Sequence, residues 1–280
     1  MGGLTILRKI NQWIQSKSLK AKIIIGGIIG LISLVALRLF VKEYDHFFVA
    51  SESIHALGIL VLIVKLTTGH KRSCSGLSLK TQELTAIFLS ARLVCSFMME
   101  NDIHTILDSI TLIFTLWVIY MIRFNLKSTY IKELDTFPLY YVIVPCAVIA
   151  LLIHPRAMTS YIARVLWSFC SCVEALSVLP QLRFMQNAKM VETFTAHYVF
   201  ALGVARFLGC AHWIFQIYES KGAYLFLAGR GHFWILLMLL AEAVQTFILV
   251  DFCYYYVKRY VSKPLILLQT IISVLILKYL

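Results

Sequence analysis

The sequence predicts an all-α polytopic membrane protein in which one leading helix is followed by a bundle of seven. Three observations support this class. Of the 280 residues, 60% are hydrophobic and only 14% are charged, whereas a soluble domain carries about 25% charged residues. Apolar runs long enough to cross a bilayer recur along the chain. One sequence pattern also occurs twice, which indicates two related halves.

The first apolar run, at about 23–41, follows the basic segment 1–22. A basic segment followed by an apolar one is also typical of a signal peptide. We interpret the run as a retained transmembrane helix, because its length of about 19 residues exceeds that of a signal-peptide core and no clear cleavage site follows it. Seven further apolar runs lie at about 47–66, 82–99, 105–122, 138–154, 162–182, 196–218 and 233–257.

The charges between these runs predict the topology. The net charge of +12 would suggest a nucleic-acid partner in a soluble protein, but here the lysines and arginines gather in alternate loops, as the positive-inside rule predicts for cytosolic loops. The N-terminus is therefore predicted to be cytosolic, and no nucleic acid is expected as a partner. We divide the chain into a basic N-terminus with the extra helix (1–46), a seven-helix domain (47–260) and an apolar tail (261–280), expected to lie in the interface or to pack as a short helix.

The repeated pattern places one arginine deep in each half. LSLKTQELTAIFLSAR (77–92) and VETFTAHYVFALGVAR (191–206) have equal length, run from a polar loop into an apolar helix and end in Ala-Arg. Pairing 47–99 with 162–218 predicts two three-helix bundles related by an axis along the membrane normal and joined by the helix at 138–154. Parallel repeats of this kind place a binding site at their interface, so we expect both arginines to face one anion-attracting cavity.

Arg92 and Arg206 are the main candidates for ligand binding. A charged side chain at membrane depth is costly and usually has a functional role. The planar guanidinium group of arginine binds a carboxylate with two parallel hydrogen bonds. The alternative is a structural pair in which Glu174 or Asp251 neutralises each arginine. Glu174 is thus either a proton-sensitive acid or a counter-ion, and Asp251 is expected to be a second buried acid.

Three further positions carry weaker signals. His55 has the side chain whose charge changes between about pH 5 and pH 8, although a neutral, hydrogen-bonded histidine is the alternative. Trp213 is expected to stack on a ligand or to belong to an interfacial aromatic belt. Pro180, followed by Gln181, is expected to kink its helix and to free a carbonyl group that Gln181 satisfies.

The sequence contains no catalytic constellation. HExxH, GxSxG, a phosphate-binding loop and a spaced Cys/His set are all missing from it. The seven cysteines include no CxxC pair and are expected to be packing thiols rather than metal ligands. We therefore expect neither enzymatic activity nor a cofactor or metal site.

Several motifs in order resemble the ER lumen protein-retaining receptor family. They are RSCSGLSLKTQ (72–82), DTF (135–137) with Pro145 beyond it, LWSF…E…LPQL (166–182), T-x-HY-x-FALG-x-x-R (195–206) and VQT-x4-DF-x-Y (244–254). The resemblance covers about Val49 to Tyr260. This family is similar in fold to the SWEET and PQ-loop transporters, so the resemblance implies a SWEET/PQ-loop-like pair of three-helix bundles, in agreement with the repeat.

The resemblance implies a function and residue roles. The receptor would bind the C-terminal tetrapeptide (K/HDEL-type signal) of luminal proteins in the mildly acidic Golgi. Coat-protein vesicles would then return the receptor with its cargo to the ER. Arg92, Arg206 and Trp213 match signal-binding residues, and His55 and Glu174 match a pH-sensing network. Asp251 and the basic residues Lys258, Arg259 and Lys263 match trafficking residues. The expected partners are the tetrapeptide, the coat-protein vesicle machinery and membrane lipid.

Five positions depart from the family pattern. Phe48 and Gln216 replace arginines, Cys95 replaces an aspartate, Arg164 replaces a glutamate and Ala205 replaces a tyrosine. Loss of two arginines removes charge-assisted hydrogen bonds of about 1.5–3 kcal/mol each, which predicts an altered signal or a lost retrieval function. With the leading helix, these departures resemble a longer, divergent, plant-type receptor-like branch. The alternatives are a small-solute transporter of SWEET-like fold and a non-binding trafficking or scaffold protein.

Overall fold

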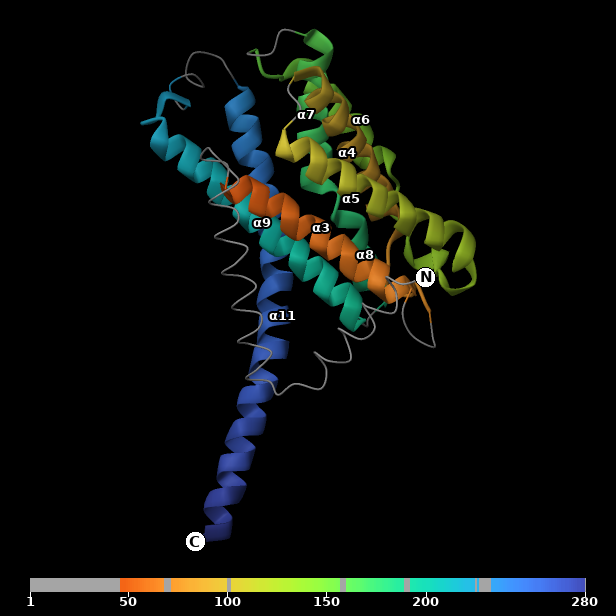
Figure 1. The fold of residues 1–280 in the computed structure, drawn as a ribbon, viewed down its shortest axis with the longest axis vertical. Coiled ribbons are helices and arrows are strands. Elements are labelled where there is room, and N and C mark those ends of the chain that lie inside the picture. The colour runs from red at the N-terminus through yellow and green to blue at the C-terminus, as the bar shows by residue number, and fades with distance from the viewer. Residues whose placement is uncertain are drawn as a thin grey trace. The chain divides into compact units, whose positions relative to one another are not determined.

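The computed structural model describes residues 46–67, 72–99, 102–156, 160–188, 192–224, 226 and 233–279, with the side chains of 259–279 left out. Within these ranges every regular element is a helix, which confirms the all-α class (Figure 1). The principal helices are α3 (His46–Thr67), α4 (Leu79–Met99), α5 (Ile103–Tyr120), α6 (Tyr140–Leu152), α7 (Tyr161–Leu176), α8 (Leu179–Ala188), α9 (Thr193–Glu219) and α11 (Trp234–Tyr279). Short turns η1 (Met121–Asn125), η2 (Lys127–Thr129) and η3 (Lys132–Leu134) follow α5. The expected leading helix at 23–41 lies outside the described residues.

Six segments of the described chain are long and apolar enough to cross a membrane: His46–Thr67, Leu79–Met99, Ile103–Asn125, Tyr161–Ala188, Thr193–Glu219 and Trp234–Lys258. The remaining expected span, at 138–154, forms helix α6, which has only 13 residues, whereas a spanning helix needs about 20. Helix α6 begins only at Tyr140, after the π-helical turn η1, the two 3₁₀ turns η2 and η3 and an irregular stretch. The chain is a multi-pass helical membrane protein.

The two copies of the repeat fold in the same register. Helix α4 begins at Leu79 and α9 at Thr193, each two residues into its copy. Arg92 and Arg206 therefore both come thirteen residues after the first residue of their helices. The two arginines occupy equivalent positions along their helices because the polar residues before each helix are equal in number in the two copies.

Helix α3 lies beside α9, as Figure 1 shows. At Gly58 a Cβ atom would come within 3.2 Å of the Ala201 Cβ and 3.5 Å of the Tyr198 ring. About two turns before Gly58, Ser51 Oγ donates a hydrogen bond of 2.7 Å to the carbonyl of Ala205 on α9. The missing side chain at Gly58 allows the two helix backbones to approach closely.

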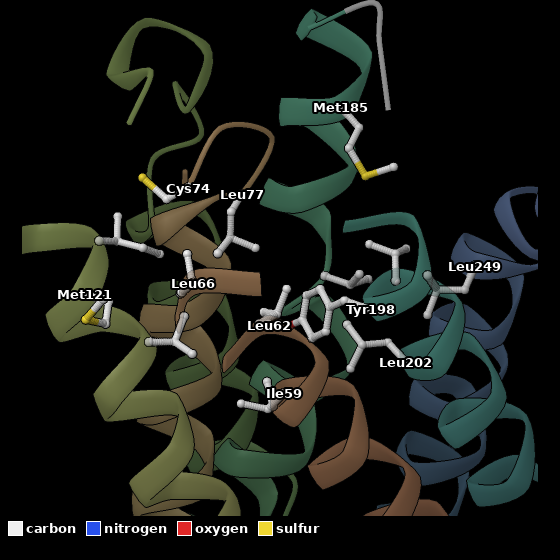
Figure 2. Close-up of a cluster of buried hydrophobic side chains, with 14 residues drawn as sticks. Ile59, Leu62, Leu66, Cys74, Leu77, Met121, Met185, Tyr198, Leu202 and Leu249 are labelled. Carbon is white, nitrogen blue, oxygen red and sulfur yellow. The ribbon is translucent and has the colours of Figure 1, made fainter. Parts of the chain in front are cut away.

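A buried apolar cluster fixes these helices to the rest of the bundle (Figure 2). It joins Ile59, Leu62 and Leu66 of α3 to Tyr198 and Leu202 of α9, with further side chains from α5, α8 and α11. A second cluster joins α4, α6 and α7 around Phe88, Leu89 and Val173. Inside a bilayer, such packing stabilises the bundle mainly through van der Waals contacts between helices.

Polar clamps close the bundle at the loop between α3 and α4. The Gln181 side chain accepts a hydrogen bond from the Ser78 backbone at 2.9 Å and donates one to the Gly76 carbonyl at 2.9 Å. Asp135 accepts hydrogen bonds from Ser78 Oγ at 2.8 Å and from Tyr130 Oη at 2.7 Å. Burial, followed by the hydrogen bond to Asp135, raises the pKa of the Tyr130 phenol. The RSCSGLSLKTQ motif therefore has a structural role here.

The expected kink at Pro180 is a complete break in the helix. Helix α7 ends at Leu176 and α8 begins at Leu179, so the expected helix at 162–182 is divided at Ser177 and Val178. The Ser177 hydroxyl donates to the Glu174 carbonyl at 2.8 Å. Gln181 binds the 76–78 loop rather than a carbonyl freed in its own helix. The break places Glu174 in the last turn of α7.

The last helix is longer than the sequence predicts. We expected it to end near 257, before a separate tail beginning at Pro264, but the backbone of α11 runs without a break from Trp234 to Tyr279. At about 1.5 Å per residue, a helix of 46 residues measures about 69 Å, which exceeds the hydrocarbon thickness of about 30 Å. A lone proline within a helical pattern did not end the helix here.

Candidate ligand-binding site

The two repeat arginines converge on one carboxylate. Arg92 Nη1 lies 3.2 Å from Glu174 Oε1 and 3.1 Å from Oε2, and Arg206 Nη1 also donates to Glu174 Oε1. Arg92 and Arg206 are 5% and 9% exposed, so both charges are held inside the helical bundle. The break after α7 sets the position of this shared acid between α4 and α9.

Arg92 has a second and closer acidic partner. Its Nε donates to Asp108 Oδ2 at 2.7 Å and its Nη2 to Asp108 Oδ1 at 2.5 Å, the bidentate geometry that a planar guanidinium favours. The same Nη2 lies 3.8 Å from Glu52 Oε1. Arg92 is therefore surrounded by three carboxylates, from α3, α5 and α7. Asp251, expected as a buried counter-ion, instead lies exposed on α11.

The aromatic ring of Phe88 lies beside both arginines and His55. The guanidinium carbons of Arg92 and Arg206 lie 5.6 and 6.0 Å from the centre of the Phe88 ring, within the range of a cation–π contact. The His55 ring stacks on Phe88 at 6.1 Å with an interplanar angle of 24°. His55 is buried, and its Nε2 has no hydrogen-bond partner among the described residues.

A small cavity lies against His55, Glu174, Arg206 and Gln245. Its volume of about 10 Å³ leaves room for about one water molecule. The Gln245 Oε1 also lacks a hydrogen-bond partner within the described chain. This cavity links His55 to the Arg206–Glu174 pair but is too small for a peptide.

A separate cavity of about 300 Å³ lies on the other side of Arg92. The residues that line it are Phe48, Glu52, Arg92, Ser96, Met99, Asp102, His104, Asp108 and Trp167. Arg206 lines the small cavity and Arg92 the large one, so the single chamber expected from the repeat is wrong. The reason is Glu174, whose carboxylate fills the space between the two guanidinium groups.

Three residues of this site were not among the sequence candidates: Glu52, His104 and Asp108. Glu52 Oε2 lies 2.7 Å from His104 Nδ1, and Asp108 holds Arg92 as described. The sequence did indicate Glu52 and Asp108, since an acidic side chain at membrane depth is a functional candidate for the same reason as an arginine. Glu52 also comes three residues before His55, on the same side of a helix.

The remaining candidates lie outside both cavities in the described part of the chain. Trp213 is half-buried beside His212, with ring centres 6.0 Å apart, and lines neither cavity. Lys258 is exposed, and its Nζ lies 5.8 Å from the Tyr254 ring centre. Arg259 and Lys263 lie in α11, where the structure describes the backbone of these residues but not their side chains.

The five departures from the family pattern have local consequences. Phe48 lines the large cavity, where its ring lies 5.0 Å from His104 and 5.4 Å from His212. The Cys95 thiol faces the Ala163 carbonyl at 3.6 Å. The other three departures are Arg164, whose guanidinium lies 5.8 Å from the Tyr161 ring, buried Ala205 and half-buried Gln216. An aromatic ring and a thiol thus occupy positions where the family has charges.

The chain is similar to receptors that carry one common name. The family model described as "ER lumen protein retaining receptor" matches residues 73–216. The ER lumen protein-retaining receptor erd-2.2 of Caenorhabditis elegans is 35% identical over 77% of this chain and 94% of its own length. The ER lumen protein-retaining receptor B of Arabidopsis thaliana is 32% identical over 75% and 92%. The receptor of Entamoeba histolytica is 30% identical over 78% and 96%. These matches do not favour the transporter or scaffold alternatives. This chain belongs to the ER lumen protein-retaining receptor family.

Proposed function

We propose that this chain is a receptor, not an enzyme, that retains luminal ER proteins by binding their C-terminal signal and returning them from the Golgi. The observation that carries the proposal is the Arg92–Glu174–Arg206 arrangement, in which two guanidinium groups share one carboxylate. The C-terminal carboxylate of a signal peptide has the same chemistry as the Glu174 side chain. It would bind by displacing Glu174 from one or both arginines.

Arg206 has donors to spare for such an exchange. A guanidinium group carries five N–H donors, and within the described chain Arg206 hydrogen-bonds to Glu174 alone. Arg92, in contrast, is held by Asp108 through two hydrogen bonds. Arg206 is therefore the side chain that turns to the ligand, while Arg92 keeps the acidic network in place. Trp213, about two turns further along α9, would contact the peptide.

The pH dependence of binding follows from His55. Its ring faces Glu174 of α7, Arg206 of α9, Gln245 of α11 and Thr85 of α4 across the small cavity, with Phe88 and Arg92 beneath. Protonation adds a third positive charge beside the Glu174 carboxylate, next to Arg92 and Arg206. The added positive charge attracts a ligand carboxylate, so binding should strengthen as pH falls.

The cellular part of the proposal rests on the family. A receptor of this kind would cycle between ER and Golgi membranes with a cytosolic N-terminus, in contact with membrane lipid. Asp251, Lys258, Arg259 and Lys263 would contact the coat-protein vesicle machinery. The exposed position of Lys258, at the end of the candidate span Trp234–Lys258, supports this role, since a protein partner reaches only surface residues.

Peptide binding to the purified full chain tests the proposal. Labelled peptides ending in Lys-Asp-Glu-Leu or His-Asp-Glu-Leu should bind saturably at about pH 5.5 and at least about tenfold more weakly at about pH 7.2, since an unperturbed histidine titrates between these values. Arg206→Ala should abolish binding, and His55→Ala should remove the pH dependence. The exposed Arg183 of α8 provides the control, because Arg183→Ala removes the same charge far from the site. Absence of saturable binding at both pH values would refute the proposal.

A further inference from the structure

The loop between α5 and α6 carries exposed positive charge at one end of the bundle. Arg123, Lys127 and Lys132 are exposed in its turns η1, η2 and η3. Arg72, which is also exposed, lies in the segment before α4 that contacts this loop. These four cations come from parts of the chain that neither cavity uses.

Hydrogen bonds fix the shape of this loop. The Cys74 backbone N–H donates to Thr129 Oγ1 at 3.0 Å, and the Cys74 thiol donates to the Leu126 carbonyl at 3.3 Å. Further along, the Asn187 side chain of α8 donates to the Leu134 carbonyl at 3.2 Å. The loop is therefore bound on one side to the segment before α4 and on the other to α8, so it presents its basic side chains from a fixed backbone.

Acidic side chains leave part of this positive charge uncompensated. Arg123 pairs with Glu83 of α4, whereas Lys127 and Lys132 form no ion pair within the described chain. Glu133 is the exposed acid of the loop. Positive side chains thus outnumber negative ones on the exposed surface of the loop, and a partner with negative charge would be attracted to it.

The same loop lies where a membrane span ends. The candidate span Ile103–Asn125 ends two residues before Lys127, and α6 begins at Tyr140. Phe124 is 70% exposed, and the exposed rings of Tyr140 and Tyr141 lie 4.6 Å apart. Exposed aromatic rings next to span ends are typical of the level of the lipid headgroups, so the basic side chains of the loop are placed at that level too.

The chemistry of this surface fits an anionic phospholipid. Basic residues beside a span attract anionic headgroups, and each one near the surface strengthens that attraction about fivefold. A phospholipid also brings acyl chains, which exposed aromatic rings at the membrane boundary would contact. The topology predicted from the loop charges places this loop on the cytosolic side, where the leaflet contains anionic lipids.

We propose that the loop 121–139 binds the headgroup of an anionic phospholipid, with Lys127 and Lys132 at its phosphate groups and Phe124 beside its acyl chains. This inference goes beyond the receptor function and does not depend on it, since the loop lines neither cavity. It adds that the protein distinguishes membranes by the charge of their lipids.

Lipid binding to the purified full chain in neutral detergent tests the proposal. The probe is a fluorescent dioctanoyl phosphatidylinositol phosphate, and the comparison is dioctanoyl phosphatidylcholine, which has no net charge. The inositol lipid should bind saturably and at least about tenfold more tightly than phosphatidylcholine. This difference should shrink as salt rises from about 0.1 M to about 0.5 M, because salt screens exposed charges.

The deacylated headgroup, glycerophosphoinositol phosphate, separates a lipid from a soluble anion. It carries the charge of the inositol lipid but no acyl chains. It should therefore bind at least about tenfold more weakly, since burial of acyl carbons strengthens lipid binding.

Lys127→Gln combined with Lys132→Gln locates the effect on the loop. Loss of two cations should weaken binding of the inositol lipid at least about tenfold, whereas Lys127→Arg with Lys132→Arg retains the charge and should stay within about twofold. The control is Arg156→Gln with Lys221→Asn, which removes two exposed cations beyond the far ends of α6 and α9. Asparagine is used because it tolerates the φ of 50° at Lys221.

Each outcome supports or overturns the proposal. Equal affinity for the two lipids would overturn it, as would a deacylated headgroup that binds as tightly as the lipid. Displacement of the lipid by an equal concentration of hexaglutamate would identify an acidic protein segment as the occupant. Undiminished binding by Lys127→Gln with Lys132→Gln would overturn the assignment to this loop. If that variant does not fold, the salt series and the headgroup comparison on the native chain decide.

Discussion

At the scale of single residues, one carboxylate holds two arginines inside the membrane. Glu174 accepts hydrogen bonds from Arg92 and Arg206, which come from the two copies of the repeat. Removal of one partner from a buried ion pair leaves uncompensated charge in a poorly polarisable interior. Glu174 should therefore contribute to stability as well as to ligand exchange.

Glu174→Gln tests this dual role. The substitution leaves two guanidinium groups facing each other without their shared counter-ion, so we expect a loss of about 3–5 kcal/mol in unfolding free energy. Thermal unfolding in detergent measures the change, with Glu133→Gln as the control. An unchanged melting temperature would contradict the shared-carboxylate geometry.

Tyr130 gives a second prediction at this scale. Its phenol donates to Asp135 and its pKa is raised by burial and by that hydrogen bond. Its contribution is therefore complete below the unfolded pKa of about 10 and is lost as pH rises above it. Below about pH 9, Tyr130→Phe should be less stable than wild type by about 1 kcal/mol.

The alkaline range distinguishes this effect from simple loss of packing. The difference between wild type and Tyr130→Phe should shrink steadily above about pH 10, where the unfolded phenol ionises. Denaturation followed from about pH 7 to pH 11 measures it. A difference that stays constant across this range would show that the phenol's protonation state does not matter.

At the scale of helices, the contact between α3 and α9 sets the position of the site. Gly58 faces Ala201, and the Ser51 hydroxyl bonds the Ala205 carbonyl. These contacts hold His55 of α3 near Arg206 of α9. Ala205 is buried and small, which suits a tight helix–helix contact.

Gly58→Val should force α3 away from α9. A Cβ atom alone would come within 3.2 Å of Ala201, and the added methyl groups increase the overlap, with an expected loss of about 1–3 kcal/mol. Peptide affinity should fall with it, because His55 and Glu52 move with α3. Leu57→Val, at the exposed neighbouring position, is the control. Equal stability of the two variants would argue against close helix contact.

At the scale of the whole molecule, the residues proposed for binding and for trafficking lie in different parts of the chain. Every residue that lines the two cavities precedes Val250, whereas the basic residues of the proposed trafficking surface follow it on α11. One long helix therefore connects the small cavity, through Gln245 and Leu249, to Lys258.

Combined replacement of Lys258, Arg259 and Lys263 by alanine should separate the two activities. Peptide affinity of the purified variant should stay within about twofold of wild type, since these residues lie beyond the site and screened surface charges act over only about 8 Å. In cells, a secreted reporter that carries the retention signal should escape in larger amounts. Arg183→Ala is the surface control, and normal retention by the triple variant would exclude this trafficking role.

The amino-acid sequence by itself determined the helical class, most helix positions and the two deep arginines in equal register. These follow from hydropathy and from spacing along the chain, which are local properties. Only the tertiary structure decided that Glu174 lies between the arginines, that Asp108 and Glu52 surround Arg92, and that two cavities replace the expected chamber. Which side chains meet depends on the rotation and approach of helices distant in sequence. One glycine at Gly58 and one break at Ser177 set that approach, and their effect on distant residues is not encoded in any local pattern.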